Sequence, residues 1–524
     1  MWTFYVIVEI CVFLLTVMLL RHYASTEVST VVMLSTGLSW MTAMSVVALV
    51  PIDVWATLSG SPSPRIGTLW DVSYWITFFL TWLIIPIHQG FVDAGDFTVT
   101  GRLRTSIRDN LLFWLIMIVL GVIGILLLIF WAHFDARDLP GYSIALSNAF
   151  GLLASVFLLG FGLVNIPKTL WSRSSPERSL KAGISKIGAI ADKVDDACFE
   201  LTTVVRVVQA TQEQMPRRDP LRKYMDVIYK YAEDESPIKP NAAAVGPRGR
   251  VDLDSISPDD LDYGNDIRGL AALRRRIKRA VSVFKGVRKQ YCDKVLQVQE
   301  LDDVCRSIRG HDYAPRGRAP RIVWLYRCLV RPWVLRSAAV ALAAVSVCVV
   351  FAEATIGVGR QPDLSPFSIL VHAKENREEI SLQLLVLLPL VYMCTCTYYS
   401  LFRLGIFSGF YFMVPGSTSP FSLLVNAALM CRFAPPLCYN FLHIIHVDDP
   451  NDGHNAATTF AKKMSAMDLI PLLGSKFNRW FPLVMVAYCG ALALTAATGW
   501  RCLAALTPGR FAFDEEEPDD AHSE

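Results

Sequence analysis

The stretch LLFWLIMIVLGVIGILLLIFW, residues Leu111–Trp131, is apolar from end to end and carries no charged side chain. A run of about 20 apolar residues is long enough, as a helix, to cross the hydrocarbon core of a bilayer. A helix that is apolar on every face has no stable place on the surface of a water-soluble protein. The stretch therefore predicts a membrane-spanning helix.

Eight further stretches have a similar length and apolar character, so the sequence predicts an all-α polytopic membrane protein with nine transmembrane helices. The composition agrees, because 53% of the residues are hydrophobic, only 19% are charged and the mean hydropathy is +0.38. The spans fall into a group of five within residues 1–167 and a group of four within residues 333–503. In chain order they are Trp2 to Leu20, Val31 to Asp53, Trp70 to Ile87, Leu111 to Trp131, Tyr142 to Pro167, Trp333 to Glu353, Ile380 to Phe402, Phe421 to Ile445 and Trp480 to Leu503.

The distribution of basic residues predicts an orientation, because arginine and lysine are enriched in the cytosolic loops of membrane proteins. Arg102, Arg104 and Arg108 lie between the third and fourth spans, whereas residues 57–69 in the preceding loop carry only Arg65. This bias predicts an N-terminus outside the cell or in the lumen, with a cytosolic C-terminus. The plasma membrane and an endolysosomal membrane are both compatible with this topology.

A long charged insert, residues 168–332, separates the two groups of spans. Apolar residues recur in it at alternating steps of three and four, which predicts two heptad helices. Residues 236–263 between them are rich in proline and glycine and predict a flexible linker. We therefore expect an antiparallel coiled-coil hairpin projecting into the cytosol, and an acidic cytosolic tail at residues 504–524. The two series are Ile184, Ile187, Ala191, Val194, Cys198, Leu201, Val205 and Val208, and Leu270, Leu273, Ile277, Ala280, Phe284, Val287 and Tyr291.

Charge is costly inside a membrane span, so ionisable residues there are the first place to look for function. The main ones are Glu9, Asp53, Glu353 and Arg432. One interpretation is an outward-facing polar vestibule with Arg432 at its floor and the carboxylates on its walls. The structural alternative is that Glu9 or Asp53 neutralises Arg432 in a buried pair that fixes the packing of the helices. The sequence leaves both open.

The span that contains Arg432 has further polar and helix-breaking residues. Pro435 and Pro436 predict a break in the helix, and Asn440 and His443 follow on the side of the proposed vestibule. His443 and His446 are three residues apart and precede two aspartates, a spacing that suits a metal ligand pair. Histidines at a membrane interface more often have no metal, so we predict neither a metal site nor a cofactor.

Enzyme signatures are absent, since the sequence contains no GxxxxGK, HExxH or GxSxG motif. We therefore predict a protein that is not an enzyme, although secondary transport leaves no compact motif and stays open. The net charge of +3 gives no argument for binding nucleic acid. A basic cytosolic rim predicts contact with membrane lipids. It consists of Arg104, Arg108, Lys168, Arg327 and Arg331.

Six colinear segments, spread over nearly the whole chain, resemble the LMBR1-like membrane protein family, and within it the LMBR1 domain-containing protein 2 branch. One of them, Leu423–Leu442, contains the motif CRFAPPLCYNF. This motif is long and unusual, which makes the resemblance more specific than a short motif would. The segments are LLVNAALMCRFAPPLCYNFL (Leu423–Leu442), ALVPID (Ala48–Asp53), YWITFFLTWLIIPIHQGFVDAGDFTVTGRLRT (Tyr74–Thr105), GFGLVNIPKTLW (Gly160–Trp171), DPLRKYMDVI (Asp219–Ile228) and CLVRPW (Cys328–Trp333).

The resemblance implies nine spans, an external N-terminus and a long cytosolic coiled-coil loop. Members of the family are described as receptors for secreted lipocalins, as lysosomal proteins needed for cobalamin export and as regulators of signalling through G-protein-coupled receptors; the branch resembled here is associated with the last. The chain departs from the animal pattern in a short outer loop near Leu58 to Thr68 and in a short C-terminal tail. The short loop argues against a large extracellular ligand.

Two functional hypotheses follow. The first is a non-enzymatic signalling or trafficking adaptor, or a regulator of membrane receptors, which binds receptors or cytosolic proteins through the insert. The second is a receptor or transporter for a small molecule or lipid held in the vestibule. We favour the first, although the insert helices have an alternative role in packing only on each other and on the membrane domain. The oligomeric state is open.

Overall fold

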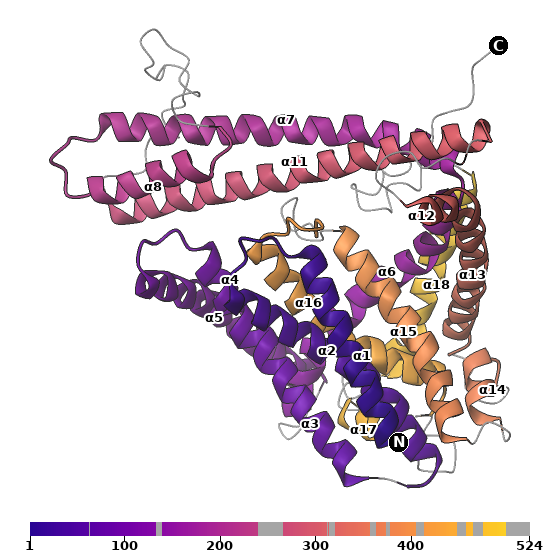
Figure 1. The fold of residues 1–524 in the computed structure, drawn as a ribbon. Coiled ribbons are helices and arrows are strands. Elements are labelled where there is room, and N and C mark those ends of the chain that lie inside the picture. The colour runs from indigo at the N-terminus through magenta and orange to yellow at the C-terminus, as the bar shows by residue number, and fades with distance from the viewer. Residues whose placement is uncertain are drawn as a thin grey trace.

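The computed structural model of the chain describes residues 1–61, 63–132, 139–238, 266–311, 313, 320–356, 363–373, 378–404, 413–447, 457–464 and 475–498. Every regular element in these residues is a helix, as the sequence predicts (Figure 1). The predicted linker from residue 239 onward and the predicted acidic tail, residues 504–524, lie outside the described residues.

Seven helices or continuous helix series are long and apolar enough to cross a membrane. The predicted fifth and ninth spans coincide with two more helices, α6 (Leu139–Ser174) and α18 (Ser475–Thr498). The count of nine spans stays a prediction. The seven are α1 (Trp2–Tyr23), α2 (Thr30–Leu58), the series α3 (Pro64–Phe79), η1 (Leu80–Ile84) and α4 (Ile85–Asp93), then α5 (Val99–Ala132), the series α12 (Arg321–Leu325), η4 (Tyr326–Val330) and α13 (Arg331–Thr355), α15 (Glu379–Leu404) and α16 (Pro420–Ile444).

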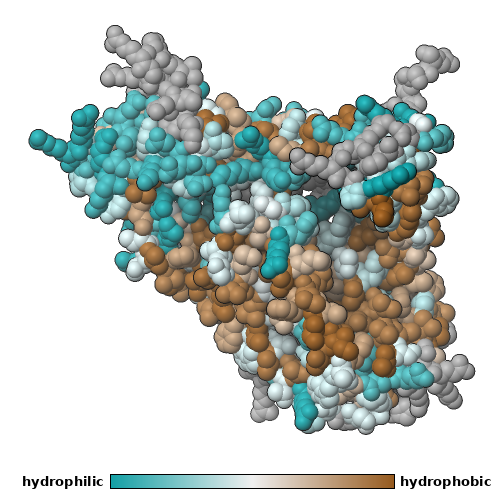
Figure 2. All heavy atoms as spheres, viewed as in Figure 1, coloured by the Kyte–Doolittle hydropathy of each residue, from teal (hydrophilic) through white to brown (hydrophobic). Residues whose placement is uncertain are grey.

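The core of this membrane domain lies where α2, α15 and α16 pack together with α6. Trp40 of α2 and Phe433 of α16 are fully buried there. By contrast, α1 and α5 expose long apolar faces, which form part of the apolar band in Figure 2. Lipid is the natural solvent of such a band, so the surface fits an integral, multi-pass membrane protein.

The predicted break at Pro435 and Pro436 is wrong as secondary structure, because α16 continues through both prolines. A proline at 436 removes the hydrogen bond to the carbonyl of Arg432, four residues earlier. α6 packs closely against this point. A Cβ added to Gly151 would lie 2.9 Å from the Arg432 carbonyl oxygen and 3.0 Å from Cγ of Pro436. Neighbouring helices commonly support proline in a membrane helix in this way.

The charged insert contributes α7 (Pro176–Gln214), α8 (Arg222–Glu235) and α11 (Ile267–Arg309). α7 and α11 lie side by side in opposite directions, and they lie across one end of the membrane domain rather than projecting away from it (Figure 1). We call this end the insert side. The N-terminus lies near the opposite end, the far side (Figure 1).

Apolar packing inside the insert is concentrated in its α8 half. Leu201, Leu273 and Ile277 are fully buried there, as the heptad pattern predicts, and α8 adds Met225 and Ile228 to the same cluster. In the other half Ile184 is largely exposed, so the predicted series is not buried throughout. The supercoiling of the two long helices stays a prediction.

The opposite end of α11 reaches the start of the second group of spans. Val304 packs there against Trp324 and Cys328, and Arg327 donates to Glu300 at 3.2 Å. α11 therefore contacts the membrane domain at more than one place along its length.

Candidate functional site

Asp53 lies near the far-side end of α2 and is buried, and its carboxylate accepts three hydrogen bonds. Oδ2 accepts from the indole N–H of Trp70 at 3.0 Å and from the backbone N–H of Phe460 at 2.8 Å. Oδ1 accepts from the backbone N–H of Thr459 at 3.1 Å. The ring of Trp70 also stacks on Phe460, with 4.3 Å between the ring centroids. Asp53 thus fastens the short helix α17 (Thr459–Met464) to α2 and α3.

Glu353 and Asn440 meet at the far side, as partners on α13 and α16. The Asn440 amide donates to Oε1 of Glu353, whose side chain is almost completely buried. The vestibule predicted from the sequence includes both Glu353 and Asn440, and the structure brings these two residues into contact. The contact connects the first helix of the second group of spans to α16.

Glu9 of α1 lies against α2. Its Oε2 accepts from the hydroxyl of Ser45 at 2.7 Å. Its other oxygen, Oε1, is buried and has no hydrogen-bond partner in the described part of the chain.

Arg432 lies over the ring of Trp82, with 5.0 Å from its guanidinium carbon to the ring centroid. Arg432 is half-buried, and its guanidinium gains from this position through its attraction to the π-face. The buried pair predicted between Arg432 and Glu9 or Asp53 is not formed, because Ser45 holds one carboxylate and Trp70, Thr459 and Phe460 hold the other. The three carboxylates have separate sets of partners.

His443 packs edge-on against Tyr439, and its Nε2 is buried without a hydrogen-bond partner in the described residues. Nδ1 of His446 lies 3.4 Å from a carboxylate oxygen of Asp363. Within the described residues no group of three or more histidine, cysteine or acidic side chains is arranged to hold a metal. The two aspartates that follow His446, at positions 448 and 449, lie outside them.

A second site, which the sequence analysis missed, joins the membrane domain to α11. It is built on the junction loop, residues 93–98, between α4 and α5. The carboxylate of Asp93, of which only 8% is exposed, accepts from two arginines of α11. Arg275 Nε donates to Oδ2 at 2.6 Å, and Arg279 Nε donates to Oδ1 at 2.7 Å. Such charge-assisted hydrogen bonds are among the stronger polar contacts in proteins.

The backbone of the junction loop also binds α11. Arg274 donates to the carbonyl of Asp96 at 2.8 Å and lies over the ring of Phe97 at 5.1 Å. Lys278 donates to the carbonyl of Val92 at 3.2 Å. Burial, reinforced by the charges of Arg102 and Arg274, lowers the pKa of Lys278 to about 8.

Gly95 makes this approach possible, since a Cβ at this position would overlap the carbonyl oxygen of Ala271. The local signal in the sequence is the basic run RRRIKR at residues 274–279 together with DAGDF at residues 93–97. Neither pattern identifies the other as its partner, because the two are far apart in the chain.

The sequence model of one family, described as LMBR1-like membrane protein, matches residues 1–497. The chain belongs to the LMBR1-like membrane protein family. This family assignment, the apolar helices and the membrane-domain surface agree with one another.

Several curated members of the LMBR1-like family are similar to the chain at modest identity. The LMBR1 domain-containing protein 2 homolog of Drosophila melanogaster is 27% identical, over 88% of this chain and 68% of its own length. The G-protein coupled receptor-associated protein LMBRD2 of Xenopus laevis is 28% identical, over 87% of this chain and 65% of its own length. The Homo sapiens protein of the same name is 27% identical, over 88% and 68%. No solved structure matches the chain.

Proposed function

We propose that this LMBR1-like protein is a non-enzymatic regulator of membrane receptors, of the kind that acts in G-protein-coupled receptor signalling. It has nine spans, an N-terminus outside or in the lumen, and a cytosolic insert that forms a coiled-coil hairpin. The printed names of relatives in Xenopus and human, which are receptor-associated, support this assignment.

The observation that carries the proposal is the attachment of α11 to the junction loop. Asp93 binds Arg275 and Arg279, and Arg274 binds the backbone beside it. A cytosolic insert fixed to the spans in this way moves together with them as one rigid body. A membrane partner bound to the spans and a cytosolic partner bound to the insert would then be held in a fixed relative position. A freely hinged insert would transmit nothing from one to the other.

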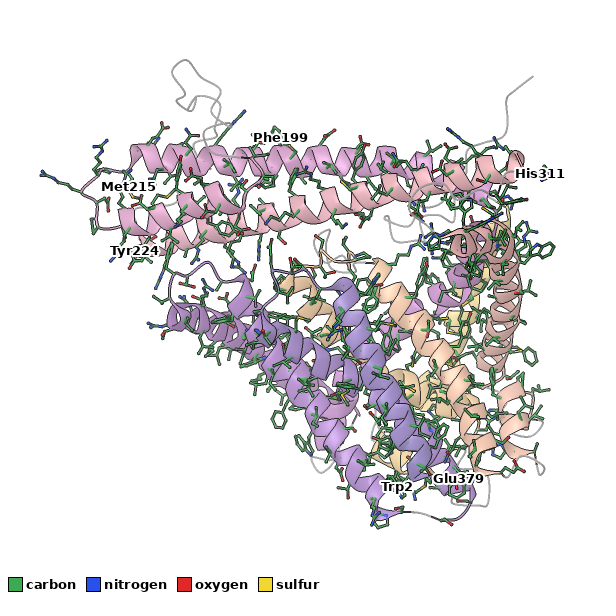
Figure 3. The ribbon with its side chains drawn as sticks, in the orientation of Figure 1. Trp2, Phe199, Met215, Tyr224, His311 and Glu379 are labelled. Atoms are coloured by element: carbon green, nitrogen blue, oxygen red, sulfur yellow. The ribbon has the colours of Figure 1, made fainter. Side chains whose placement is uncertain are left out.

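The outer face of α7 is where a cytosolic partner would bind. Phe199 is 75% exposed and points away from α11, whereas Met215 and Tyr224 lie at the end where α7 passes into α8 (Figure 3). Aromatic residues are enriched in protein–protein interfaces relative to the rest of the surface, which makes Phe199 a candidate contact. Because three quarters of the Phe199 side chain is exposed, its replacement is expected to affect binding more than folding.

Two measurements test the proposal. The first is energy transfer between the tagged full chain and a panel of tagged G-protein-coupled receptors, which reports association. The second is the amount of cyclic AMP that each stimulated receptor produces in the presence and absence of the chain. The wild-type chain is expected to associate with at least one receptor and to change its response. Phe199→Ser is expected to keep the receptor association and lose the change in signalling. Leu296→Ser, which removes another exposed apolar side chain from α11, is the matched control. Absence of association with every receptor would overturn the proposal.

One observation favours the second function, a receptor or transporter for a small molecule in an outward-facing vestibule. Glu9 Oε1 and His443 Nε2 are both buried without hydrogen-bond partners in the described residues. Buried polar atoms of this kind are candidates for contact with a bound molecule. A cryo-electron microscopy map in lipid nanodiscs tests this function, since ordered non-protein density beside either atom would support it. A dry, filled interior at both atoms would exclude it.

A further inference from the structure

Residues 321–330, which form α12 and η4 just before α13, expose a continuous apolar helix face. Ile322 is 83% exposed, and four further apolar side chains follow it at steps of three or four residues, each of them more than 40% exposed. Such steps return to the same side of a helix. We call this face the α12 edge. It consists of Ile322, Leu325, Tyr326, Leu329 and Val330.

The opposite side of the same segment packs on the insert. Trp324 and Cys328 are buried there against Val304 of α11, and Arg327 donates to Glu300 of α11 at 3.2 Å. In Figure 1, α12 lies between the end of α11 and the start of α13. The segment therefore has one side against α11 and its apolar side turned away from it.

The length of the helix series shows that this segment lies outside the hydrocarbon core. α12, η4 and α13 together have 35 residues, or about 52 Å at 1.5 Å per residue, whereas the hydrocarbon core is about 30 Å thick. The 25 residues of α13 are enough to cross the core alone. The surplus falls on the insert side, because Arg327 binds Glu300, whose side chain is 62% exposed.

A tryptophan marks the headgroup level next to the α12 edge. Trp333, at the start of α13, is 70% exposed, and Arg336 lies over its ring at 5.6 Å. Exposed tryptophan at the end of a span is typical of the headgroup layer. The α12 edge thus lies at or just beyond the headgroup layer of the insert-side leaflet.

The α12 edge is continuous with the face that α13 turns to lipid. Trp333, Val340 and Val347 extend the same row of exposed side chains along the span. Arginine residues border the edge, and basic residues beside an exposed apolar face suit an anionic membrane surface. Lipid that covers α13 therefore meets the α12 edge without a break. The bordering residues are Arg321, Arg327 and Arg331.

We propose that the α12 edge binds the lipid surface of the insert-side leaflet, with its apolar side chains inserted at the boundary between headgroups and acyl chains. Removing these side chains from water is favourable in proportion to their apolar area. Because Trp324 and Cys328 hold the same segment against Val304, the bilayer surface also fixes the position of the end of α11. This inference does not depend on the regulation of receptors.

Photo-crosslinking of the full chain in nanodiscs of phosphatidylcholine and phosphatidylserine tests the contact directly. Ile322→p-benzoylphenylalanine is expected to give an adduct with the mass of the labelled peptide plus one phospholipid. Phe199→p-benzoylphenylalanine is the matched control, because Phe199 is also largely exposed but points away from α11 (Figure 3). No phospholipid adduct is expected at position 199. Absence of the adduct at position 322, or equal adducts at both positions, would overturn the proposal.

Crosslinking of Ile322→p-benzoylphenylalanine in native membranes distinguishes lipid from protein as the occupant. The phospholipid adduct is expected there as well. A crosslink from position 322 to another protein in place of the lipid would show that a protein covers the α12 edge, and the proposal would be wrong.

Hydrogen exchange of the full chain in the same nanodiscs measures the attachment. Leu329→Asp is expected to speed exchange of the backbone amides in residues 321–330 and in the last turns of α11, because a carboxylate is costly at this depth. Phe199→Asp adds the same charge at an exposed apolar position of α7 and is expected to leave both segments unchanged. Exchange in Leu329→Asp at the wild-type rate would show that the bilayer does not hold α12 and η4.

Discussion

The α-carbon of Gly95 lies against the carbonyl oxygen of Ala271, so close that no side chain fits between the junction loop and α11. This contact lies beside the hydrogen bond from Arg274 to the Asp96 carbonyl. The close backbone contact and the arginine hydrogen bond therefore both attach the junction loop to α11 at the same place. The attachment of the insert depends on a glycine as much as on the arginines around it.

Gly95→Ala is expected to open this junction, because the added methyl group must displace either the loop or α11. Hydrogen exchange of the backbone amides in residues 93–98 and 270–279 is the measurement, and faster exchange in both segments is expected. Gly286→Ala, also on α11, is the control because a Cβ there meets nothing within 4 Å. Unchanged exchange in Gly95→Ala would show that the junction is not held at this contact.

Asp93 and Arg275 are expected to be energetically coupled. Removing either partner loses the charge-assisted hydrogen bonds between them. The double variant Asp93→Ala/Arg275→Ala should therefore lower the free energy of unfolding by less than the sum of the two single variants. We expect a coupling free energy of about 1 to 2 kcal/mol. The value is modest because the Arg275 side chain is 40% exposed and solvent screens its charge. Unfolding of the four proteins in detergent by added SDS measures it. Additive losses would mean that the contact contributes nothing to stability.

Asp53→Ala is expected to destabilise the fold by about 3 kcal/mol or more, because it leaves the N–H groups of Trp70, Thr459 and Phe460 without their acceptor. Thermal unfolding in detergent measures the change. Trp70→Phe, which removes one of these donors and keeps an aromatic ring against Phe460, is expected to cost about 1 kcal/mol. A variant at position 53 that melts like the wild type would favour a role in binding over one in structure.

Lys186 of α7 and Lys294 of α11 give the stability a predictable dependence on pH. The pKa values of Lys186 and Lys294 in the folded chain are about 8, below the ordinary value of 10.5. The unfolded chain therefore binds more protons between these values, so the free energy of unfolding should rise as pH increases from about 8 toward 10.5.

Melting temperatures of the wild type and of Lys186→Gln/Lys294→Gln across this pH range measure that contribution. The difference between the two proteins is expected to shift in favour of the wild type as pH rises. A difference that is independent of pH would contradict the lowered pKa values.

The sequence predicted the helical class because the signal is local. Leu111–Trp131 can only be an apolar helix in lipid, and the spacing of Leu270, Leu273 and Ile277 identifies the buried face of α11. A shorter signal was overlooked: Met225 and Ile228 of α8 are also spaced for a helix face, but α8 has only 14 residues. Its place in the insert depends on packing against α7 and α11.

The partners of the ionisable residues could not be predicted in the same way. Asp53 binds backbone N–H groups of residues 459 and 460, and any residue type supplies such groups. Its charge suggested Arg432 as a partner because charge is visible in a sequence, whereas a helix end that approaches from far along the chain is not. For the same reason, the sequence left open whether the insert packs on the membrane domain, since Asp93 and the arginines of α11 that join them are far apart in the chain.

The 43 residues of α11 make a rod about 65 Å long at 1.5 Å per residue. One part of the rod is fixed to the junction loop between α4 and α5, and its last turns pack against Trp324 and Cys328 at the start of the helix series that contains α13. It therefore acts as a strut that sets the spacing between the two halves of the membrane domain. Any partner or solute that needs the halves to move apart has to bend this strut or release one of its ends.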